Sequence, residues 1–239
     1  MKKIFKVEFP DEIFRKRIQK LVRVGLNDVV TPDMFNSIRE LDISNRKIKS
    51  LKGIEYLTEL EQLNCSVNAL TELDVSNNKK LRGLYCSTNK LRQLDLTNNR
   101  EIYHLEIACN TLKEIDLSNN VKIVYLYMDL NDFTRIDLRN LTKLAKLKCG
   151  FNQLVELDLT QNKELIYLDC VMNNLKRINL RQNTKLRHLN CEFNDIAVLD
   201  VSQNLDLEYL NCDRINIKSI DLKRNEKLRQ VNSVEWTNA

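Results

Sequence analysis

The chain has 239 residues, of which 38 are Lys or Arg and 33 are Asp or Glu, and its formal net charge is +5. This slight imbalance is not the dense basic stripe of a nucleic-acid-binding protein, and no apolar run approaches the ~20 residues that a membrane helix needs. We therefore expect neither a nucleic-acid partner nor a membrane partner. The start, MKKIFKVEFP, has too short an apolar core for a signal peptide, so the chain as written is expected in the cytoplasm, or secreted or at the cell surface if it was trimmed from a longer protein.

The first part of the chain predicts a small helical cap. Asp11 can cap a helix on which Phe14, Ile18 and Leu21 share one face. A second helix is expected to begin after Thr31, because a proline follows at the first helical position. We expect both helices to cover the apolar end of the segment that follows. The basic residues of the first helix are expected to face solvent, the alternative being contact with a membrane surface or phosphate.

The remainder of the chain repeats with a period of 21 residues. Apolar residues recur at the first, fourth, sixth, eleventh, fourteenth and sixteenth places of each interval, a spacing that neither a helix nor a single strand produces. A fixed period in the twenties is typical of a solenoid, whose coils bury their apolar edges against their neighbours. The first place is always leucine or isoleucine: Leu60, Leu81, Ile102, Ile123, Leu144, Leu165, Leu186, Leu207 and Leu228.

These patterns predict an α/β protein in two parts. Residues 1–37 form the helical N-terminal cap, and residues 38–239 form a right-handed solenoid with a parallel concave β-sheet and irregular return legs. The solenoid comprises one 22-residue repeat at 38–59, eight 21-residue repeats at 60–227 and a partial terminal repeat at 228–239.

Asparagine recurs in two columns, at the ninth and nineteenth places. Its side chain both donates and accepts, so stacked copies can satisfy backbone groups of their own coil and of the next one. The ninth-place column is Asn68, Asn89, Asn110, Asn131, Asn152, Asn173 and Asn194. The nineteenth-place column is Asn78, Asn99, Asn120, Asn162, Asn183, Asn204 and Asn225, with Leu141 as its one break.

Six of the 7 cysteines occupy the sixth place, where the other two coils carry Ile107 and Met128. Exchange with aliphatic residues indicates small buried side chains, so we expect reduced thiols in the core and no disulfides. The six are Cys65, Cys86, Cys149, Cys170, Cys191 and Cys212.

The repeat L-x-x-L-x-C-x-x-N-x-L followed by L-x-x-L-D-L-x-x-N resembles the bacterial leucine-rich repeat class with a 21-residue nested unit, as in residues 144–164 and 165–185. The FPDEIFRKRI and VVTPDMFNSI stretches and the repeat at 38–59 are similar to the cap and first repeat of the internalin family. The resemblance implies a bacterial protein that binds a partner protein, in this case a host surface protein. It specifies the architecture far more than the activity, because such repeats serve many unrelated binding roles.

No catalytic or metal-binding arrangement emerges from the sequence. His104 and His188 lie four coils apart, about 19 Å at the usual strand spacing, and therefore cannot share a metal. Cys109 lies too far along an extended strand from His104 for a nucleophile pair. There is no glycine-rich phosphate loop, H-E-x-x-H or C-x-x-C motif. We expect no enzyme activity, no cofactor and no metal.

Aspartates recur at the fifteenth place, and neighbouring carboxylates about 5 Å apart repel one another. We expect this column to face solvent and to be compensated by the lysines and arginines of the same return legs, with calcium bridging as the alternative. The column is Asp74, Asp95, Asp116, Asp137, Asp158, Asp200 and Asp221, interrupted by Asn179.

The outward places of the predicted strands carry six of the 7 tyrosines, although the fold requires nothing specific there. Tyrosine combines a rigid apolar ring with a polar tip and is enriched in interfaces, so we interpret this face as a recognition surface. The eighth place adds Phe151 and Phe193, for which half-burial beside the asparagine column is the alternative. Lys146 and Lys148 lie in one coil between acidic neighbours and would steer a partner of complementary charge. The predicted binding residues are Tyr85, Tyr103, Tyr125, Tyr127, Lys146, Lys148, Phe151, Tyr167, Phe193 and Tyr209.

The sequence thus predicts a non-catalytic scaffold that binds a protein partner. The alternatives are a carbohydrate-binding module that uses the same aromatic face, and a repeat segment of an effector enzyme whose catalytic domain is not part of this chain. At the C-terminal end, Val234 and Trp236 are expected to fold over the last coil and leave a monomer, the alternative being an edge that pairs with a second chain.

Overall fold

The N-terminal cap is built on one α-helix, as seen in a computed structural model that describes residues 7–25 and 28–232. Helix α1 (Glu12–Leu21) is capped by Asp11, whose Oδ1 accepts the N–H groups of Ile13 and Phe14 at 2.9 and 3.0 Å. The second oxygen, Oδ2, accepts the N–H groups of Lys49 and Ser50 in the first coil. One carboxylate therefore caps the helix and ties it to the solenoid, and the predicted N-cap is confirmed.

The second helix begins at Pro32, as predicted, and is a short 3₁₀ helix, η1 (Pro32–Phe35), without a side-chain capping bond from Thr31. One detail of the predicted cap is wrong: Leu21 is 36% exposed because α1 ends at that residue, whereas Phe14 and Ile18 are fully buried. Phe35 of η1 is also buried, so both helices contribute to the core at this end of the solenoid.

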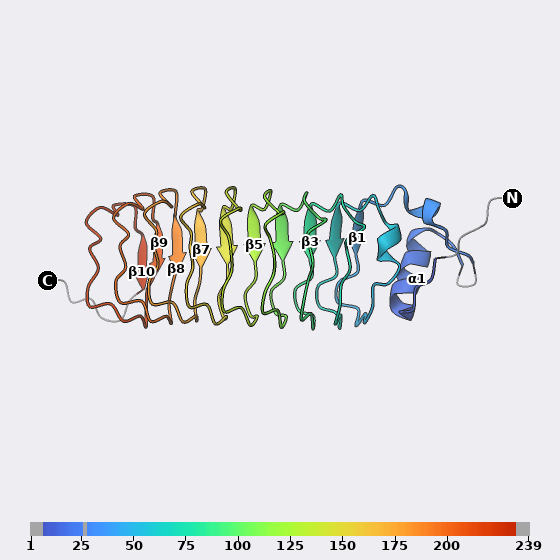
Figure 1. The fold of residues 1–239 in the computed structure, drawn as a ribbon, viewed down its shortest axis with the longest axis horizontal. Helices are drawn as coiled ribbons and strands as arrows, with labels where there is room; N and C mark the ends of the chain where they lie inside the picture. The colour runs from blue at the N-terminus through green and yellow to red at the C-terminus, as the bar shows by residue number, and fades with distance from the viewer. Residues whose placement is uncertain (1–6, 26–27, 233–239) are drawn as a thin grey trace.

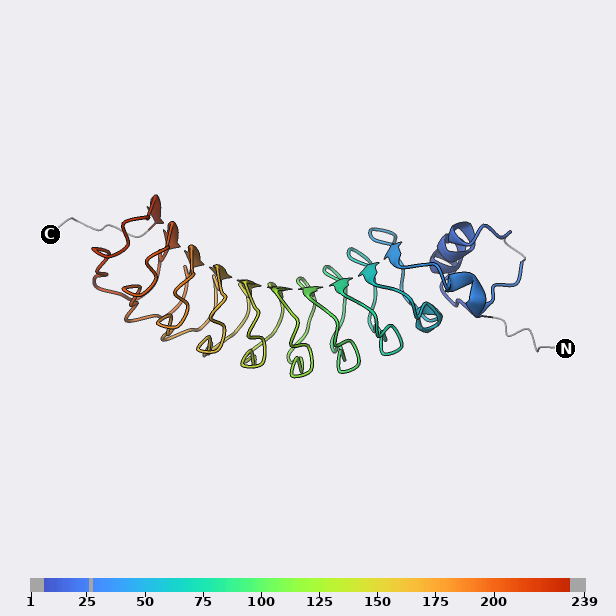
Figure 2. The ribbon, with the colours of Figure 1, turned by 90° about the horizontal axis from the view of Figure 1, so that it is seen from above.

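The coils stack through one parallel sheet of ten strands in sequential order. Paired residues in neighbouring strands lie one full repeat apart in the sequence, as Lys146 and Tyr167 do. A short turn, η2 (Ile54–Tyr56), lies in the first coil. The strands follow one another along the inner side of an arc, and the return legs form its outer side (Figures 1 and 2). The strands are β1 (Glu40–Asp42), β2 (Gln62–Asn64), β3 (Gly83–Tyr85), β4 (His104–Glu106), β5 (Tyr125–Tyr127), β6 (Lys146–Lys148), β7 (Tyr167–Asp169), β8 (His188–Asn190), β9 (Tyr209–Asn211) and β10 (Gln230–Asn232). This is the predicted concave parallel sheet of a leucine-rich repeat solenoid.

In β1 to β9 the middle residue of each three-residue strand is buried in the core, and its two neighbours point toward the hollow. In β6, for example, Leu147 is fully buried while Lys146 and Lys148 are partly exposed. The sixth-place cysteines lie beside this leucine column, and all 7 cysteines are free, as predicted. Burial raises the pKa of the Cys65 thiol to about 12, so the core thiols are uncharged and unreactive.

The ninth-place asparagines bind neighbouring coils together, as predicted. Asn152 is representative: its Nδ2 donates to the carbonyls of Met128, Cys149 and Gly150, and its Oδ1 accepts the N–H of Phe133. These four contacts, at 3.0 to 3.1 Å, span two coils. The column therefore replaces the hydrogen bonds that the turning backbone would otherwise lose.

The nineteenth-place column is satisfied on one side only. Asn162 donates from Nδ2 to the carbonyls of Leu138 and Leu141 at 3.0 and 2.8 Å, but its buried Oδ1 has no partner. The other asparagines of this column share the unpaired Oδ1. This incomplete satisfaction is consistent with the column's single apolar member, Leu141, which is fully buried.

Candidate binding surface

The N-terminal part of the concave face is a cluster of rings around His104. The rings of Tyr85, Tyr125 and Tyr127 lie 4.9, 5.2 and 5.4 Å from the imidazole, and that of Tyr103 lies 6.3 Å away. The Tyr85 hydroxyl contacts Nδ1 at 3.3 Å. The other ring nitrogen, Nε2, lies 2.9 Å from Oε1 of Glu106, but the two atoms do not have the geometry of a hydrogen bond. Four of the predicted tyrosines thus converge on one histidine.

The centre of the face is a pair of lysines between two tyrosine rings. The Lys146 ammonium lies 4.4 Å from the ring centroid of Tyr167 and 5.5 Å from that of Tyr127. The Lys148 ammonium lies 5.3 Å from Tyr127 and 5.9 Å from Tyr167. These are cation–π distances, and they hold two positive charges at the middle of the hollow.

The C-terminal part is a flat stack of three rings on consecutive strands. Tyr167 and His188 stack at 4.1 Å with an interplanar angle of 6°, and His188 and Tyr209 stack at 4.2 Å with an angle of 3°. Burial, and then the charges of the two central lysines, lowers the pKa of His188 below 6.5, so the ring is neutral at pH 7. Because each ring covers its neighbour, the stack presents ring edges to the hollow.

Beside the lysines lies one partly buried carboxylate, Asp129. Burial raises its pKa to about 6, and its Oδ1 accepts the N–H of Gly150 at 2.9 Å. Residue 150 has to be glycine for a steric reason, since a Cβ there would lie 2.7 Å from Cγ1 of Val171. The carboxylate and the glycine thus form one local unit at the edge of the face.

The two predicted phenylalanines lie apart from the rings, in the turns that follow the strands. Phe151 and Phe193 are 45% and 39% exposed, so each side chain is a little more than half buried, as the alternative of half-burial beside the asparagine column predicted. The backbone there adopts φ near +52°, a left-handed conformation that directs the eighth-place side chain away from the core.

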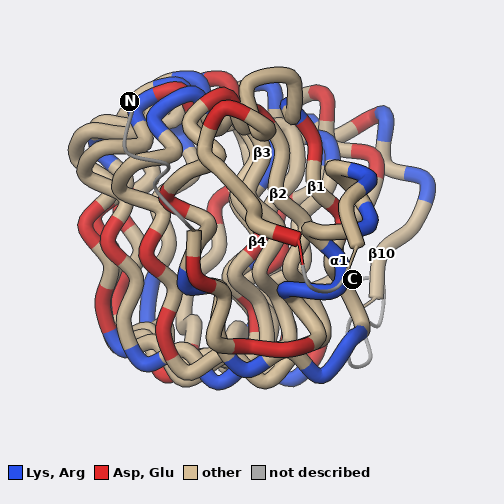
Figure 3. Tube along the Cα trace, turned by 90° about the vertical axis from the view of Figure 1, so that its right-hand side faces the viewer, with Lys and Arg blue, Asp and Glu red and all other residues tan. Residues whose placement is uncertain are grey.

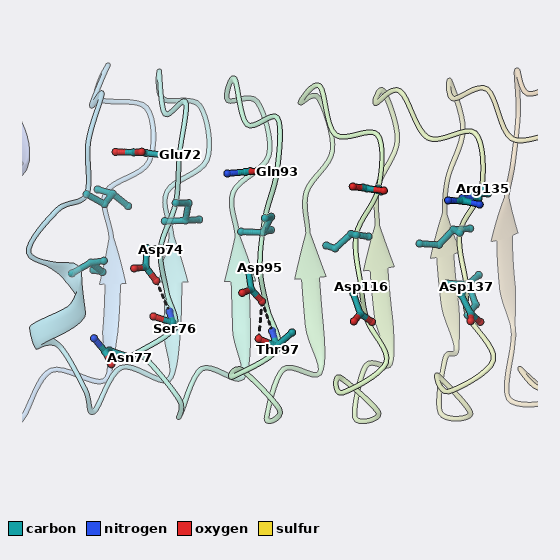
Figure 4. A pocket seen from close by; sticks show the side chains of 18 of the residues that line it. Glu72, Asp74, Ser76, Asn77, Gln93, Asp95, Thr97, Asp116, Arg135 and Asp137 are labelled. Carbon is teal, nitrogen blue, oxygen red and sulfur yellow. Dashed lines mark hydrogen bonds between the residues drawn. The ribbon is translucent and has the colours of Figure 1, made fainter.

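The aspartate column lies on the outer side of the solenoid and lines a groove of about 1540 Å³ over an apolar floor (Figure 4). The expected compensation by lysines and arginines is found only in part, where Asp137 pairs with Arg139 at 2.7 Å and Asp200 with Arg181 at 3.5 Å. All seven aspartates accept the N–H of the residue two places later, as Asp74 does from Ser76. Lysines of the return legs instead pair with acids of the preceding coil, as Lys185 does with Glu164 at 2.6 Å.

Charge is otherwise spread around the coils, with both signs interspersed when the solenoid is viewed along its axis (Figure 3). Within the described part of the chain, no group of three or more His, Cys, Asp or Glu side chains could hold a metal ion. Over the same residues, no helix has the length and apolarity needed to cross a bilayer.

The structure therefore brings the predicted tyrosines and lysines into one surface, which we call the tyrosine face: Tyr85, Tyr103, Tyr125, Tyr127, Lys146, Lys148, Tyr167 and Tyr209. Sequence reasoning missed the part played by the two histidines, which it weighed only as metal ligands and, for His104, as the partner of a cysteine nucleophile. They share the third-place column with Tyr125, Tyr167 and Tyr209, and that shared place is the signal that could have revealed them. The residues Val234 and Trp236 lie outside the described range.

Stacked parallel coils with a concave sheet and asparagine columns define a leucine-rich repeat solenoid. Residues 9–171 match the family described as the LRR domain of the endo-beta-N-acetylglucosaminidase EndoS. The match covers well over half of the chain, so the protein belongs to that family.

Listerial internalins share this architecture. The functional domain of internalin J from Listeria monocytogenes, described as including a cysteine ladder, has a TM-score of 0.79 at 29% identity, over 96% of this chain and 57% of that domain. Internalin C2 from the same species has a TM-score of 0.74 at 24% identity, over 95% of this chain and 94% of its own. In sequence, 70 residues are 35% identical to internalin J, covering 29% of this chain and 8% of internalin J.

The chain thus spans less than two thirds of internalin J, and it is a bacterial, internalin-like leucine-rich repeat protein. Scaffolds of this kind are typically non-catalytic and serve protein interactions.

Proposed function

We propose that the protein captures a protein partner on the tyrosine face, with a host surface protein as the class of partner. The observation that carries the proposal is the difference between this face and the rest of the solenoid. Third- and fifth-place side chains are not required by the core, yet in six successive strands, β4 to β9, they assemble into aromatic, cationic and polar contacts. Rigid aromatic groups beside charges are typical of interface centres.

The ring geometry supports a protein over a carbohydrate partner. Sugars stack on open ring faces, but both faces of His188 are covered by tyrosines, and the Lys146 ammonium lies over Tyr167. What the stack offers is ring edges and hydroxyl tips, which suit the mixed apolar and polar groups of a protein surface.

Carbohydrate remains the second candidate for one reason: the matching family is named for a domain of an endo-beta-N-acetylglucosaminidase, an enzyme that acts on glycans.

The cellular location of the protein depends on which partner it binds. If the partner is a host surface protein, the chain acts at the bacterial surface or outside the cell, which fractionation of the native bacterium would test.

An array experiment tests the proposal. Labelled protein is applied to purified extracellular host protein domains and, in parallel, to a glycan array. A triple variant with Tyr125→Ala, Tyr127→Ala and Tyr167→Ala is expected to lose every protein hit while keeping its circular dichroism spectrum. The matched control replaces Gln93, Arg135 and Glu156 of the outer groove by Ala and should keep the hits. Hits confined to the glycan array, or protein hits that survive in the tyrosine variant, would contradict the proposal.

A further inference from the structure

Four large apolar side chains in consecutive coils are exposed although nothing in the fold requires them to be apolar. They follow β5 to β8 at the eighth place, and we call them the apolar ridge: Leu130, Phe151, Met172 and Phe193, which are 48%, 45%, 44% and 39% exposed. Elsewhere in the same column Thr88 and Arg214 are accommodated, so packing does not select for apolar residues. Exposed apolar surface of this extent marks a binding site more often than a structural one.

The left-handed backbone at the eighth place belongs to the repeat, since φ lies between 50° and 56° in all eight coils from Val67 to Arg214. Gly and Asn are more readily accommodated at such φ values than branched or aromatic residues, and the column nevertheless contains neither. The ridge differs from the rest of this column in its run of four large apolar side chains.

The spacing of the ridge is that of the sheet. The N–H groups of Leu130, Phe151 and Met172 donate to carbonyls of the next coil at 3.0, 2.8 and 3.0 Å. The backbones therefore keep the strand separation of about 4.8 Å, and the ridge is about 14 Å long. Apolar residues at i, i+3, i+7 and i+10 of an α-helix rise by about 4.5, 10.5 and 15 Å, which matches within about 1 Å. One face of an extended strand repeats at about 6.8 Å and falls out of step after one coil.

Charges along the neighbouring strands supply a direction. The lysines Lys146 and Lys148 lie beside the N-terminal half of the ridge, where the partly buried carboxylate of Asp129 accepts the N–H of Gly150. Toward the C-terminal half, carboxylates follow at Asp169 and Glu192, and the Arg214 guanidinium lies 5.0 Å from the ring centroid of Phe193. A helix is most stable with acidic residues in its first turns and basic residues in its last. Such a helix complements this surface when it runs in the same direction as the solenoid.

We propose that the partner presents an amphipathic α-helix that lies on the apolar ridge along the solenoid axis. Its acidic N-terminal half faces Lys146 and Lys148, and its basic C-terminal half faces Asp169 and Glu192. This inference rests on the proposed function, because it names the element that the partner inserts beside the tyrosine face.

Synthetic peptides test the inference without the natural partner. The probe is an acetylated, amidated 18-residue helix with Leu at positions 4, 7, 11 and 14, Glu in its first half and Lys in its second. One control exchanges the Glu and Lys residues, and a second rearranges the same composition into strict apolar–polar alternation. Fluorescence anisotropy at low salt is expected to show binding of the probe at least tenfold tighter than of either control. Absence of binding, or equal binding of the alternating peptide, would overturn the inference.

Variants of the protein test whether the probe peptide binds at the apolar ridge. Phe151→Asn with Met172→Asn is expected to weaken probe binding at least tenfold without lowering the thermal midpoint, since Asn suits the left-handed backbone. Val155→Asn with Val198→Asn, two exposed apolar positions off the ridge, should leave binding unchanged. Retained binding in the ridge variant would refute the site. A different result is a protein partner from the array that requires the tyrosines and yet binds the ridge variant as tightly as the wild type. That result would refute the helix proposal but not the proposed function.

Discussion

The return legs and the strand face of this protein use the same 21-residue frame in opposite ways. The return legs repeat the same solutions with one exception in each column, Asn179 and Leu141: an aspartate accepts the N–H two residues later, and an asparagine bridges two coils. The strand face changes at every coil: His104, Tyr125, Lys146 and Tyr167 occupy one place in four successive strands. Repetition therefore marks what the fold needs, and variation on the frame marks what the fold leaves free for recognition.

The largest loss of stability is expected at the ninth-place asparagines, whose side chains have all their hydrogen-bonding groups paired. Asn152→Ala removes three donated bonds and one accepted bond between buried groups, and we expect a loss of about 3 to 5 kcal/mol in the free energy of unfolding. Urea unfolding followed by circular dichroism measures this loss. A change below 1 kcal/mol would show that the ninth-place column does not hold the coils together.

The next effect concerns Asp129 and depends on pH. Its pKa of about 6 exceeds the value of 3.8 in an unfolded chain, so the folded chain holds an extra proton between about pH 4 and 6. Stability is therefore lost as pH rises through this window. Asp129→Asn keeps an oxygen for the Gly150 N–H and removes the charge.

We expect the Asp129→Asn variant to be roughly 1 to 3 kcal/mol more stable than the wild type at pH 8 and nearly equal to it at pH 4. Thermal unfolding across that range is the measurement. A variant that is less stable than the wild type at both values would show that Asp129 is stabilised by its neighbours rather than strained by burial.

The nineteenth-place asparagines test the difference between a side-chain amide whose hydrogen bonds are complete and one whose oxygen is unpaired. Asn162→Ala removes only two donated bonds and eliminates an unpaired buried oxygen, so a loss of about 1 kcal/mol is expected. Parallel urea titrations of the two asparagine variants measure the ratio directly. Equal losses at Asn152 and Asn162 would contradict the difference inferred from their bonding.

The smallest effect is expected on the face itself. Tyr125 is 37% exposed and contacts His104 at 5.2 Å, so Tyr125→Ala should cost less than about 1 kcal/mol. The same urea assay applies. A loss comparable to that of Asn152→Ala would mean that the tyrosine face stabilises the fold in the same way as the frame does.

Much of the fold could be predicted because each rule recurs. The Leu, Cys and Asn columns fixed the coils, the parallel sheet and the burial of thiols such as Cys65, since a residue one period away is a spatial neighbour. The cap was less predictable, because Leu21 lies at a helix end whose position depends on the coil it covers.

The site was predictable as a face but not as a set of contacts. Placing Tyr167 and Tyr209 on the same face required only the period, whereas the stacking of both on His188 depends on side-chain rotamers that no pattern encodes. The compensation of the aspartates could be predicted only in part, for a similar reason. The period places Arg139 and Lys185 on return legs, and only the geometry of each leg pairs Arg139 with Asp137 and Lys185 with Glu164.

The most direct test of the central claim is a crystal structure of the chain bound to a protein partner identified on the array. Recognition by the tyrosine face predicts that the partner buries Tyr125, Tyr127, Lys146 and Tyr167 at the centre of its contact area, with the coils unmoved. A partner seated on the outer groove of the return legs, with those four side chains still open to solvent, would contradict it.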